Sequence, residues 1–86
     1  MYYFYVLKSK KDDDLYRGFT NNLRRRLDEH NTGLSKSTKG RRPFKLVYYE
    51  TFASKNDAKR REKQMKLNGR AWGQLKRRIQ NSIEEA

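Results

Sequence analysis

The segment Tyr2–Leu7 (YYFYVL) is the feature that most constrains how this chain can fold. All six residues are aromatic, β-branched or aliphatic. Because successive side chains of a strand point to opposite faces of a sheet, this run presents apolar side chains on both faces. The sequence therefore predicts a strand that is covered on both sides. A chain of 86 residues can bury only one modest core, so we expect a single domain over residues 1–83 and a short acidic tail at 84–86.

A second strand, Leu15–Gly18, follows the charged turn Ser9–Asp14, and the two strands are predicted to form a hairpin. Tyr5 and Tyr16 are eleven residues apart. In an antiparallel hairpin whose loop has an even number of residues, this odd separation puts both phenols on one face, opposite or diagonal to each other. An odd loop or a bulge would separate them.

The stretch Tyr16–Asn31 (YRGFTNNLRRRLDEHN) runs from the second strand into a basic helix. Gly18 is expected to end the strand, and Thr20 or Asn21 to cap the helix. Gly33 follows as a helix stop.

One side of this helix carries both apolar and cationic side chains. At roughly 100° per residue, the members of this stripe are Leu23, Arg26, Leu27 and His30. The adjacent cations that point away from it are Arg24 and Arg25. A guanidinium facing the body of the domain has lost water and needs a partner, either a carboxylate or the phosphate of a ligand. Arg26 is therefore the residue of this helix that most needs an explanation.

The middle of the chain predicts a loop and a third strand. Leu34–Arg42 (LSKSTKGRR) is expected to be a mobile loop whose hydroxyl and cationic groups suit phosphate. Phe44–Phe52 (FKLVYYETF) is expected to be a strand with apolar side chains on both faces. With the helices that follow, the predicted order is β-β-α-β-α-α, an α+β fold.

Two helices complete the chain. Ser54–Asp57 has the spacing of a capping box, with Asp in place of Glu, and opens a basic helix that runs from Lys55 to about Leu67. The inward stripe of this helix consists of Ala58, Glu62 and Met65, so Glu62 is an acid on the buried side of a basic helix. The last helix carries an amphipathic stripe at Trp72, Leu75, Ile79 and Ile83.

The amino-acid composition limits the kinds of binding partner and metal that the protein can have. With 22 Lys and Arg against 10 Asp and Glu, the formal net charge is +12, so the surface attracts polyanions, nucleic acid before an anionic membrane surface. Cysteine is absent and there is one His, so any metal would be a hard cation held by carboxylate and water. No stretch approaches the ~20 apolar residues of a membrane span, and we find no signal peptide. We therefore expect a cytoplasmic domain, a monomer, with no membrane partner.

Two phenols on one sheet face, an inward Arg, a His one turn further on and an inward Glu would make a phosphodiester site. Glu62 could hold a divalent ion together with water and phosphate oxygens. Arg26 could stabilise charge that develops on the phosphate, and a phenol could activate a water. His30 could serve as acid, base or phosphate contact.

Each of these residues also has a structural interpretation. Arg26 and Glu62 could form a structural ion pair, and Tyr5 and Tyr16 could be ordinary strand aromatics. His30 near the end of its helix could simply complement the helix dipole. The basic helix faces could be merely solvated. From the residues alone, we predict only a basic α/β domain that binds nucleic acid.

The order and spacing of several short motifs indicate a more specific function. Tyr3-Phe4-Tyr5 and Tyr16-Arg17-Gly18 form a pair of motifs, and Arg26 and His30 follow eight and twelve residues after the motif glycine. Two later runs are Arg41–Glu50 (RRPFKLVYYE) and Ala58–Lys66 (AKRREKQMK). In these motifs nearly the whole chain resembles the GIY-YIG nuclease superfamily, and specifically its small stand-alone bacterial proteins.

The resemblance implies a three-stranded antiparallel sheet flanked by three helices, and hydrolysis of DNA phosphodiester bonds with a single divalent ion, Mg or Mn. It implies that Tyr5 and Tyr16 position or deprotonate the water, and that Arg26 contacts the scissile phosphate. It also implies that His30 assists and that Glu62 coordinates the metal.

Three positions differ from the pattern of the superfamily. Tyr3 stands where Gly is typical, and Arg17 replaces an aliphatic residue, so Arg17 is expected to snorkel or to lie at a thin edge. The loop after His30 offers Ser37, Thr38 and Lys39 where some relatives place a second His.

Three functions follow as hypotheses. The first is an endonuclease acting on DNA. The second is a nucleic-acid-binding module of the same fold with little or no catalysis, and the third is a protein-interaction domain for an acidic partner. DNA is favoured over RNA as the nucleic acid. The residues predicted to contact it are Arg24, Arg25, Lys36, Lys39, Arg41, Arg42, Lys63 and Lys66.

Overall fold

The computed structural model describes all 86 residues and places β1 (Tyr2–Ser9) in the middle of an antiparallel sheet, between β2 (Leu15–Thr20) and β3 (Phe44–Phe52). Four consecutive β1 residues are at most 1% exposed, namely Phe4, Tyr5, Val6 and Leu7. The predicted strand covered on both sides is therefore confirmed.

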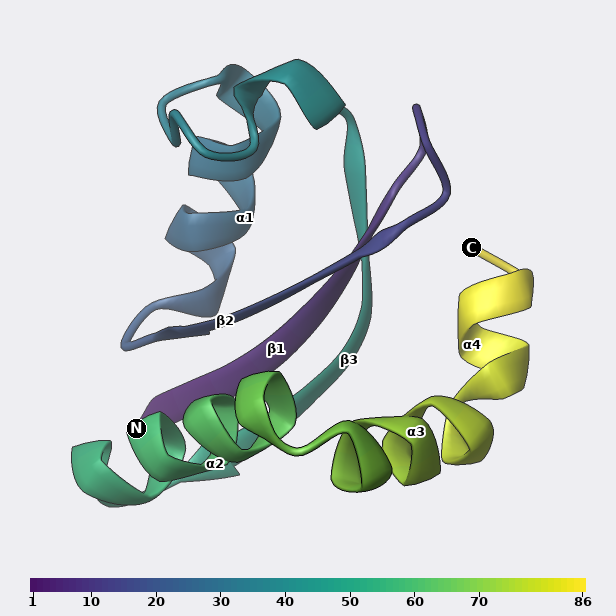
Figure 1. Cartoon of the computed structure of the whole chain (residues 1–86). Helices are drawn as coiled ribbons and strands as arrows, with labels where there is room; N and C mark the ends of the chain where they lie inside the picture. The colour runs from purple at the N-terminus through teal and green to yellow at the C-terminus, as the bar shows by residue number, and fades with distance from the viewer.

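Helices pack against both faces of the sheet (Figure 1). On one face, Tyr5, Leu7 and Phe44 pack with the leucines of α1 (Leu23–Thr32). On the other face, Phe4 and Val6 pack with apolar side chains of the C-terminal helices. Those helices are α2 (Lys55–Leu67), α3 (Gly69–Arg78) and α4 (Gln80–Glu84).

The last predicted helix is divided in two. The backbone leaves the helical conformation at Ile79, which separates α3 from α4. The predicted stripe nevertheless packs as expected, because all four of its members join the core cluster of Phe4 and Val6. A short 3-10 helix, η1 (Lys39–Arg41), adds an element that the sequence did not predict. None of the helices is both long enough and apolar enough to cross a membrane.

The hairpin between β1 and β2 brings the two phenols together. Tyr5 lies opposite Gly18 and Leu7 lies opposite Tyr16, so the two tyrosines are diagonal neighbours on one face. Their ring centroids are 6.3 Å apart. Counted between the last paired residues, Lys8 and Leu15, the loop has an even number of residues, so the predicted shared face is confirmed.

Gly18 provides space for Tyr5 and does not end the strand. The strand continues two residues beyond it to Thr20, so the expected strand end was wrong. A Cβ atom at position 18 would lie 2.5 Å from Cζ of Tyr5. Only a residue without a side chain allows the phenol to cross β2 at this point.

We expect Gly18→Ala to lower the free energy of unfolding by about 1–3 kcal/mol, because a methyl group has to displace a fully buried ring. Urea denaturation measures the change. Gly40→Ala is the matched control, since a Cβ there would meet no atom within 4 Å. Equal stability of the two variants would contradict this account of Gly18.

Both expected helix caps need correction. Asn22, rather than Thr20 or Asn21, caps α1, and its side chain accepts a hydrogen bond from the Arg25 backbone N–H at 3.1 Å. Ser54 occupies the N-cap position of α2, but its side chain makes no capping hydrogen bond, so the predicted capping box does not form. Gly33 ends α1 in a left-handed conformation, as predicted.

The loop between α1 and β3 is fastened to the domain, contrary to the expectation of a mobile loop. Ser35 and Thr38 are buried, and the Ser9 hydroxyl donates a hydrogen bond of 2.6 Å to the Arg41 carbonyl. These hydroxyls point inward, where they satisfy buried polar groups, so they are not presented to a phosphate on the surface.

Candidate active site

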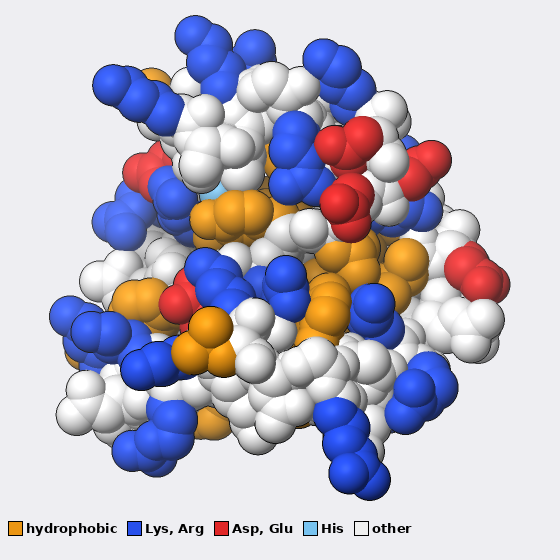
Figure 2. Space-filling model, in the orientation of Figure 1, with side chains coloured by type: hydrophobic (Ala, Val, Ile, Leu, Met, Phe, Trp, Pro, Cys, Tyr) orange, Lys and Arg blue, Asp and Glu red, His pale blue; other side chains and the backbone are white.

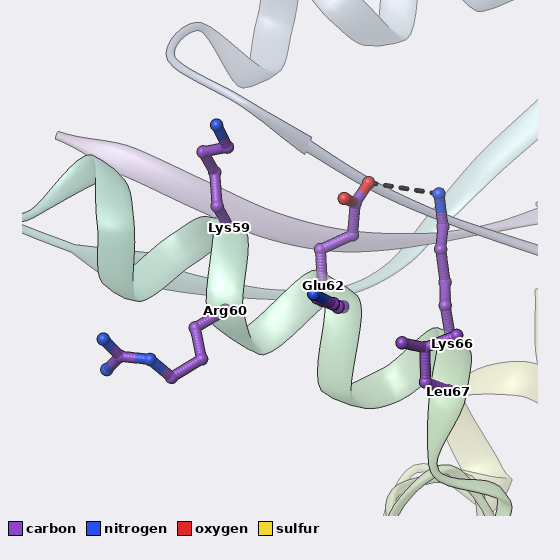
Figure 3. A pocket seen from close by; sticks show the side chains of 6 residues that line it. Lys59, Arg60, Glu62, Lys66 and Leu67 are labelled. Carbon is purple, nitrogen blue, oxygen red and sulfur yellow. Dashed lines mark ion pairs between the residues drawn. The ribbon is translucent and has the colours of Figure 1, made fainter.

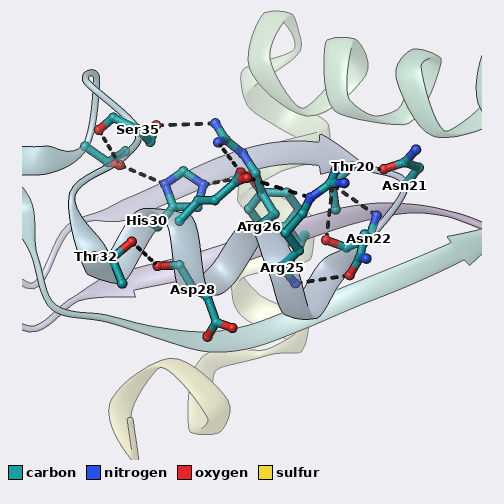
Figure 4. A network of polar contacts seen from close by, with 12 residues as sticks. Thr20, Asn21, Asn22, Arg25, Arg26, Asp28, His30, Thr32 and Ser35 are labelled. Carbon is teal, nitrogen blue, oxygen red and sulfur yellow. Dashed lines mark hydrogen bonds and ion pairs between the residues drawn. The ribbon is translucent and has the colours of Figure 1, made fainter.

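Helix α1 directs His30 and Arg26 toward the sheet, as their spacing predicted. His30 is fully buried, and its Nε2 atom lies 2.8 Å from the Tyr5 hydroxyl oxygen. The imidazole also packs against the ring of Tyr16, with centroids 4.9 Å apart. Figure 4 shows His30 and Arg26 on the same side of α1, with Asp28 on another side. Four predicted site residues therefore meet on one face of the sheet.

Thr38 defines the proton positions in this cluster. Its hydroxyl oxygen lies 2.7 Å from His30 Nδ1, and the hydroxyl donates its own proton to the Ser35 carbonyl at 3.4 Å. Because a hydroxyl has one proton to donate, Thr38 accepts the hydrogen bond from Nδ1–H. His30 Nε2 is then unprotonated and accepts the hydrogen bond of the Tyr5 O–H. The result is a buried chain of Thr38, His30 and Tyr5.

Burial determines the charge state of this chain. Burial, with the positive charge of Arg26 added, lowers the pKa of His30 to about 4. Burial also raises the pKa of the Tyr5 phenol well above its usual value, and an ionised Tyr16 raises it further. Both groups are therefore neutral at pH 7, with the phenol as donor and the imidazole as acceptor.

The stability of the protein is expected to fall in acid because of His30. Its folded pKa of about 4 lies below the unfolded value of 6.5, so protonation favours the unfolded chain. The stabilisation is complete above about pH 6.5 and falls by about 3 kcal/mol as the pH approaches 4. Urea denaturation at pH 7 and pH 4, compared with His30→Gln, measures it. The same pH dependence in both proteins would exclude the effect.

Thr38→Val is expected to change the tautomer of His30. Without an acceptor at Nδ1, the proton moves to Nε2, and Tyr5 must then accept where it now donates. The ¹⁵N chemical shifts of the imidazole distinguish the two tautomers. Thr38→Ser retains the hydroxyl and should retain Nδ1–H, whereas Nε2–H in the unmodified protein would contradict the assignment.

Arg26 is partly exposed and is held by residues near it in the chain. Its guanidinium forms an ion pair of 3.0 Å with Glu29 and donates a hydrogen bond of 3.3 Å to the Ser35 hydroxyl. The structural alternative of an Arg26–Glu62 ion pair is therefore wrong. Arg26 also lines an open hollow of about 540 Å³ together with Asn21 and Lys55, so a ligand can reach it.

Glu62 lies on the other side of β2, in a hollow of about 510 Å³ along α2 whose other charged side chains are all cationic. Its carboxylate pairs with Lys66 at 3.3 Å. Figure 3 shows Glu62 and Lys66 extending from α2 in the same direction as Lys59, while Arg60 points elsewhere. Glu62 makes no hydrogen bond or ion pair with Tyr5, Tyr16, Arg26 or His30, and its charge is the smallest of the effects that shift the pKa of Tyr5.

The donor set for a metal is small. No three His, Asp or Glu side chains come together anywhere in the chain. Glu62 is a single carboxylate, and Mg²⁺ in proteins is often held by one or two carboxylates, completed by water and substrate phosphates. Glu62 fits this open kind of site and does not fit an all-protein cage.

The two tyrosines differ in exposure. Tyr5 is 1% exposed and its hydroxyl is engaged with His30. Tyr16 is only partly buried, and its hydroxyl makes no hydrogen bond within the chain. Tyr16 is therefore the phenol available to a ligand, and Tyr5 lies behind it with His30.

Arg17 does not enter this cluster, because it points to the opposite face of the sheet from Tyr16. Its guanidinium lies 4.5 Å over the ring of Trp72 and donates a hydrogen bond of 2.7 Å to the Met65 carbonyl near the end of α2. The charged head is therefore held by a carbonyl and an aromatic ring instead of extending into water, and the side chain attaches α2 and α3 to the sheet.

The predicted nucleic-acid contacts fall into two groups. The exposed cations without an ion pair are Arg24, Lys36, Lys39, Arg42 and Lys63. The cations already paired with an acid are Arg25 with Glu29, Arg41 with Asp12, and Lys66 with Glu62. Figure 2 shows basic side chains spread over this face of the protein, around hydrophobic ones that reach the surface.

The sequence did not identify the roles of Thr38, Ser35 and Glu29 as partners of His30 and Arg26. Thr38 carried one signal, because it falls in the loop where some relatives have a second His. Ser35 and Glu29 carried none, since their roles depend on how the loop folds back over α1.

Comparison with known proteins identifies the family of the chain. The model of the GIY-YIG catalytic domain matches residues 1–79. A UPF0213 protein of Clostridium perfringens is 52% identical over 63 residues, covering 72% of this chain and 67% of that protein. A UPF0213 protein of Bacillus pumilus is 48% identical over 66 residues, covering 76% of this chain and 66% of that protein. The chain thus spans about two thirds of the length of these two relatives.

A solved structure matches as well. The solution NMR structure of a UPF0213 protein from Bacillus halodurans has a TM-score of 0.54 and 41% sequence identity, covering 87% of this chain and 82% of that one. The predicted fold class and the predicted family are both confirmed. The chain belongs to the family of GIY-YIG catalytic domains, which indicates a nuclease-type function on nucleic acid.

Proposed function

We propose that this protein is an endonuclease that hydrolyses phosphodiester bonds of DNA with the help of a divalent metal ion. The observation that carries the proposal is the convergence of Tyr5, Tyr16, Arg26 and His30 under α1. Glu62 lies apart from this cluster on α2, where it pairs with Lys66. A net charge of +12 supports a polyanionic substrate.

Arg26 is proposed to bind the scissile phosphate. In the free protein its partners are Glu29 and the buried Ser35 hydroxyl, and the guanidinium itself lines an open hollow. A phosphate can replace the Ser35 contact and accept two hydrogen bonds from the planar guanidinium. The cation would then lie beside the negative charge that increases on the phosphate during hydrolysis.

The phenols and the imidazole are proposed to handle the proton of the attacking water. Tyr16 orients the water with its free hydroxyl. As the water oxygen bonds to phosphorus, the bond from phosphorus to the leaving oxygen of the strand breaks. The water proton can pass to the Tyr5 oxygen while the Tyr5 proton moves to His30 Nε2, 2.8 Å away, and the leaving oxygen takes a proton from solvent. His30 can hold this proton only transiently, because its Nε2 atom is unprotonated but burial lowers the pKa of the imidazole to about 4.

Glu62 is the residue proposed to hold the divalent ion, Mg or Mn, together with water and phosphate oxygens. When bound, such an ion supplies positive charge that stabilises the reacting phosphate. Lys66, which now pairs with Glu62, would be free to contact a second phosphate of the strand.

The test is cleavage of labelled single- and double-stranded DNA with Mg or Mn and with a chelator, comparing the protein with Arg26→Ala and Glu62→Ala. We expect metal-dependent strand scission that both substitutions reduce. Absence of scission, or scission that both variants perform equally well, would exclude the proposal.

A second candidate is a binding module of the same fold with little catalysis. This function is favoured by the small number of carboxylates that could bind a metal, because Glu62 is the only acidic side chain in its hollow and the other charged side chains there are cationic. This function predicts binding that weakens steeply as salt rises, without scission. Failure to bind nucleic acid even at low salt would exclude both candidates and favour an acidic protein partner.

A further inference from the structure

A third hollow of about 610 Å³ lies on the same side of the sheet as the candidate active site. Its most distinctive members are two aromatic side chains, Tyr3 and Tyr49, whose ring centroids are 6.1 Å apart at an interplanar angle of 61°. Tyr49 is 52% exposed, an unusual position for a large ring on a covered sheet face. We call this hollow the tyrosine groove.

The tyrosine groove adjoins the candidate active site. Tyr49 lies directly opposite Tyr5 in the pairing of β1 with β3, and Tyr3 lies two residues before Tyr5 on the same face. The N-terminal half of α1 separates the groove from the hollow that contains Arg26. Asn21, at the start of that helix, lines both hollows. A bound strand can therefore pass from one to the other around the end of α1.

The walls of the groove combine apolar and polar groups. Leu27 and Leu46 cover its floor, and Arg24 provides an unpaired cation at its rim. The Asn21 side-chain oxygen accepts from Arg25, but its NH₂ group makes no hydrogen bond within the chain. One carboxylate, Asp28, also faces the groove and can accept a hydrogen bond from an amino group.

We propose that the tyrosine groove binds an unpaired nucleobase of the strand whose phosphate lies at Arg26. This inference rests on the proposed nuclease function and specifies its substrate class. An exposed tyrosine is a stacking platform for a base of any sequence. The Asn21 amide and the Asp28 carboxylate can pair with base edges, and Arg24 can contact the adjoining phosphate.

The proposal restricts the substrate. A base in an intact duplex is stacked and paired, and moving it into the groove costs a few kcal/mol of unpairing and unstacking. A base in a single strand, a flap or a loop is already free. The preferred substrate is therefore DNA with unpaired bases beside the bond that is cut.

The test uses a single-stranded oligonucleotide that contains 2-aminopurine, whose fluorescence falls when the base stacks on an aromatic ring. Binding is measured in a chelator, so that no cleavage is required. We expect quenching with the unmodified protein, its loss with Tyr49→Ala, and an affinity about tenfold lower in that variant. Tyr49→Trp should restore both quenching and affinity. Leu34→Ala, which removes an exposed apolar side chain outside the groove, is the control and should change neither.

Three results would overturn the proposal. Quenching that persists in Tyr49→Ala would place the base elsewhere, and an equal loss of affinity for a blunt duplex would show that the groove does not select unpaired bases. Sedimentation that shows a dimer of this chain, converted to a monomer by Tyr49→Ala, would make the groove a contact between copies. This binding assay contains no metal, whereas the cleavage assay requires one. A negative result here would therefore reject the groove as a base site without rejecting the proposed nuclease function.

Discussion

Arg26→Ala is expected to lower kcat/KM for DNA cleavage by about 10²–10³-fold, the usual effect of removing a donor that stabilises transition-state charge. The guanidinium is partly exposed, lines an open hollow and lies within electrostatic reach of Tyr5. Its present contacts are an ion pair with Glu29 and one hydrogen bond to Ser35, so its removal should affect stability little. Cleavage rates over a range of substrate concentrations, with thermal unfolding alongside, measure both quantities.

Arg25→Ala is the matched control for this experiment. Arg25 neighbours Arg26 on α1 and also pairs with Glu29, but its side chain is 57% exposed, against 28% for Arg26. We expect Arg25→Ala to weaken binding modestly at low salt and to leave kcat unchanged. Arg26→Lys retains the charge and loses the planar pair of donors, so only part of the activity should return. Equal activity in Arg25→Ala and Arg26→Ala would show that Arg26 is one surface cation among many.

Glu62→Gln is expected to reduce metal-dependent cleavage by about 100-fold or more and to weaken binding of Mn²⁺. The amide retains the shape of the side chain and removes the charge that attracts the ion. Glu62 forms one partly exposed ion pair, with Lys66, so we expect the folded state to remain intact. Titration of Mn²⁺ by calorimetry, in the presence of an uncleavable oligonucleotide, gives a readout that does not depend on turnover.

Asp57→Asn is the control for Glu62→Gln. Asp57 is another α2 acid, paired with Arg60 at 3.3 Å and largely exposed. It lies outside the hollow of Glu62. Its substitution changes the net charge by the same amount and should leave Mn²⁺ binding and cleavage unaltered. A similar loss in both variants would indicate a general effect of charge rather than a metal ligand at position 62.

Local patterns were sufficient for the positions of most elements. The apolar run of Tyr2–Leu7 requires cover on both faces, and 86 residues can supply that cover in few ways. The helical period predicted that Arg26 and His30 face inward, and the two-residue period of strands predicted that Tyr5 and Tyr16 share a face. These predictions were correct because they depend only on backbone geometry and on the burial of apolar side chains.

Predictions that depended on competing polar groups were less reliable. Thr20, Asn21 and Asn22 can all cap a helix, and the choice of Asn22 depends on where β2 ends. The loop between α1 and β3 was expected to be mobile because it is polar. Its Thr38 and Ser35 hydroxyls instead lie inside, where they accept hydrogen bonds from the His30 imidazole and the Arg26 guanidinium.

The amino-acid sequence by itself determined the order of the strands and helices, the inward direction of Arg26 and His30, and a strongly basic surface. The tertiary structure decided which neighbour each of these groups meets. It pairs Arg26 with Glu29, seats His30 between Tyr5 and Thr38, and leaves Tyr16 as the phenol open to a ligand. Periodicity specifies the face on which a side chain lies. The partner across that face depends on loop packing and on the space over Gly18, and both arise only when distant segments come together.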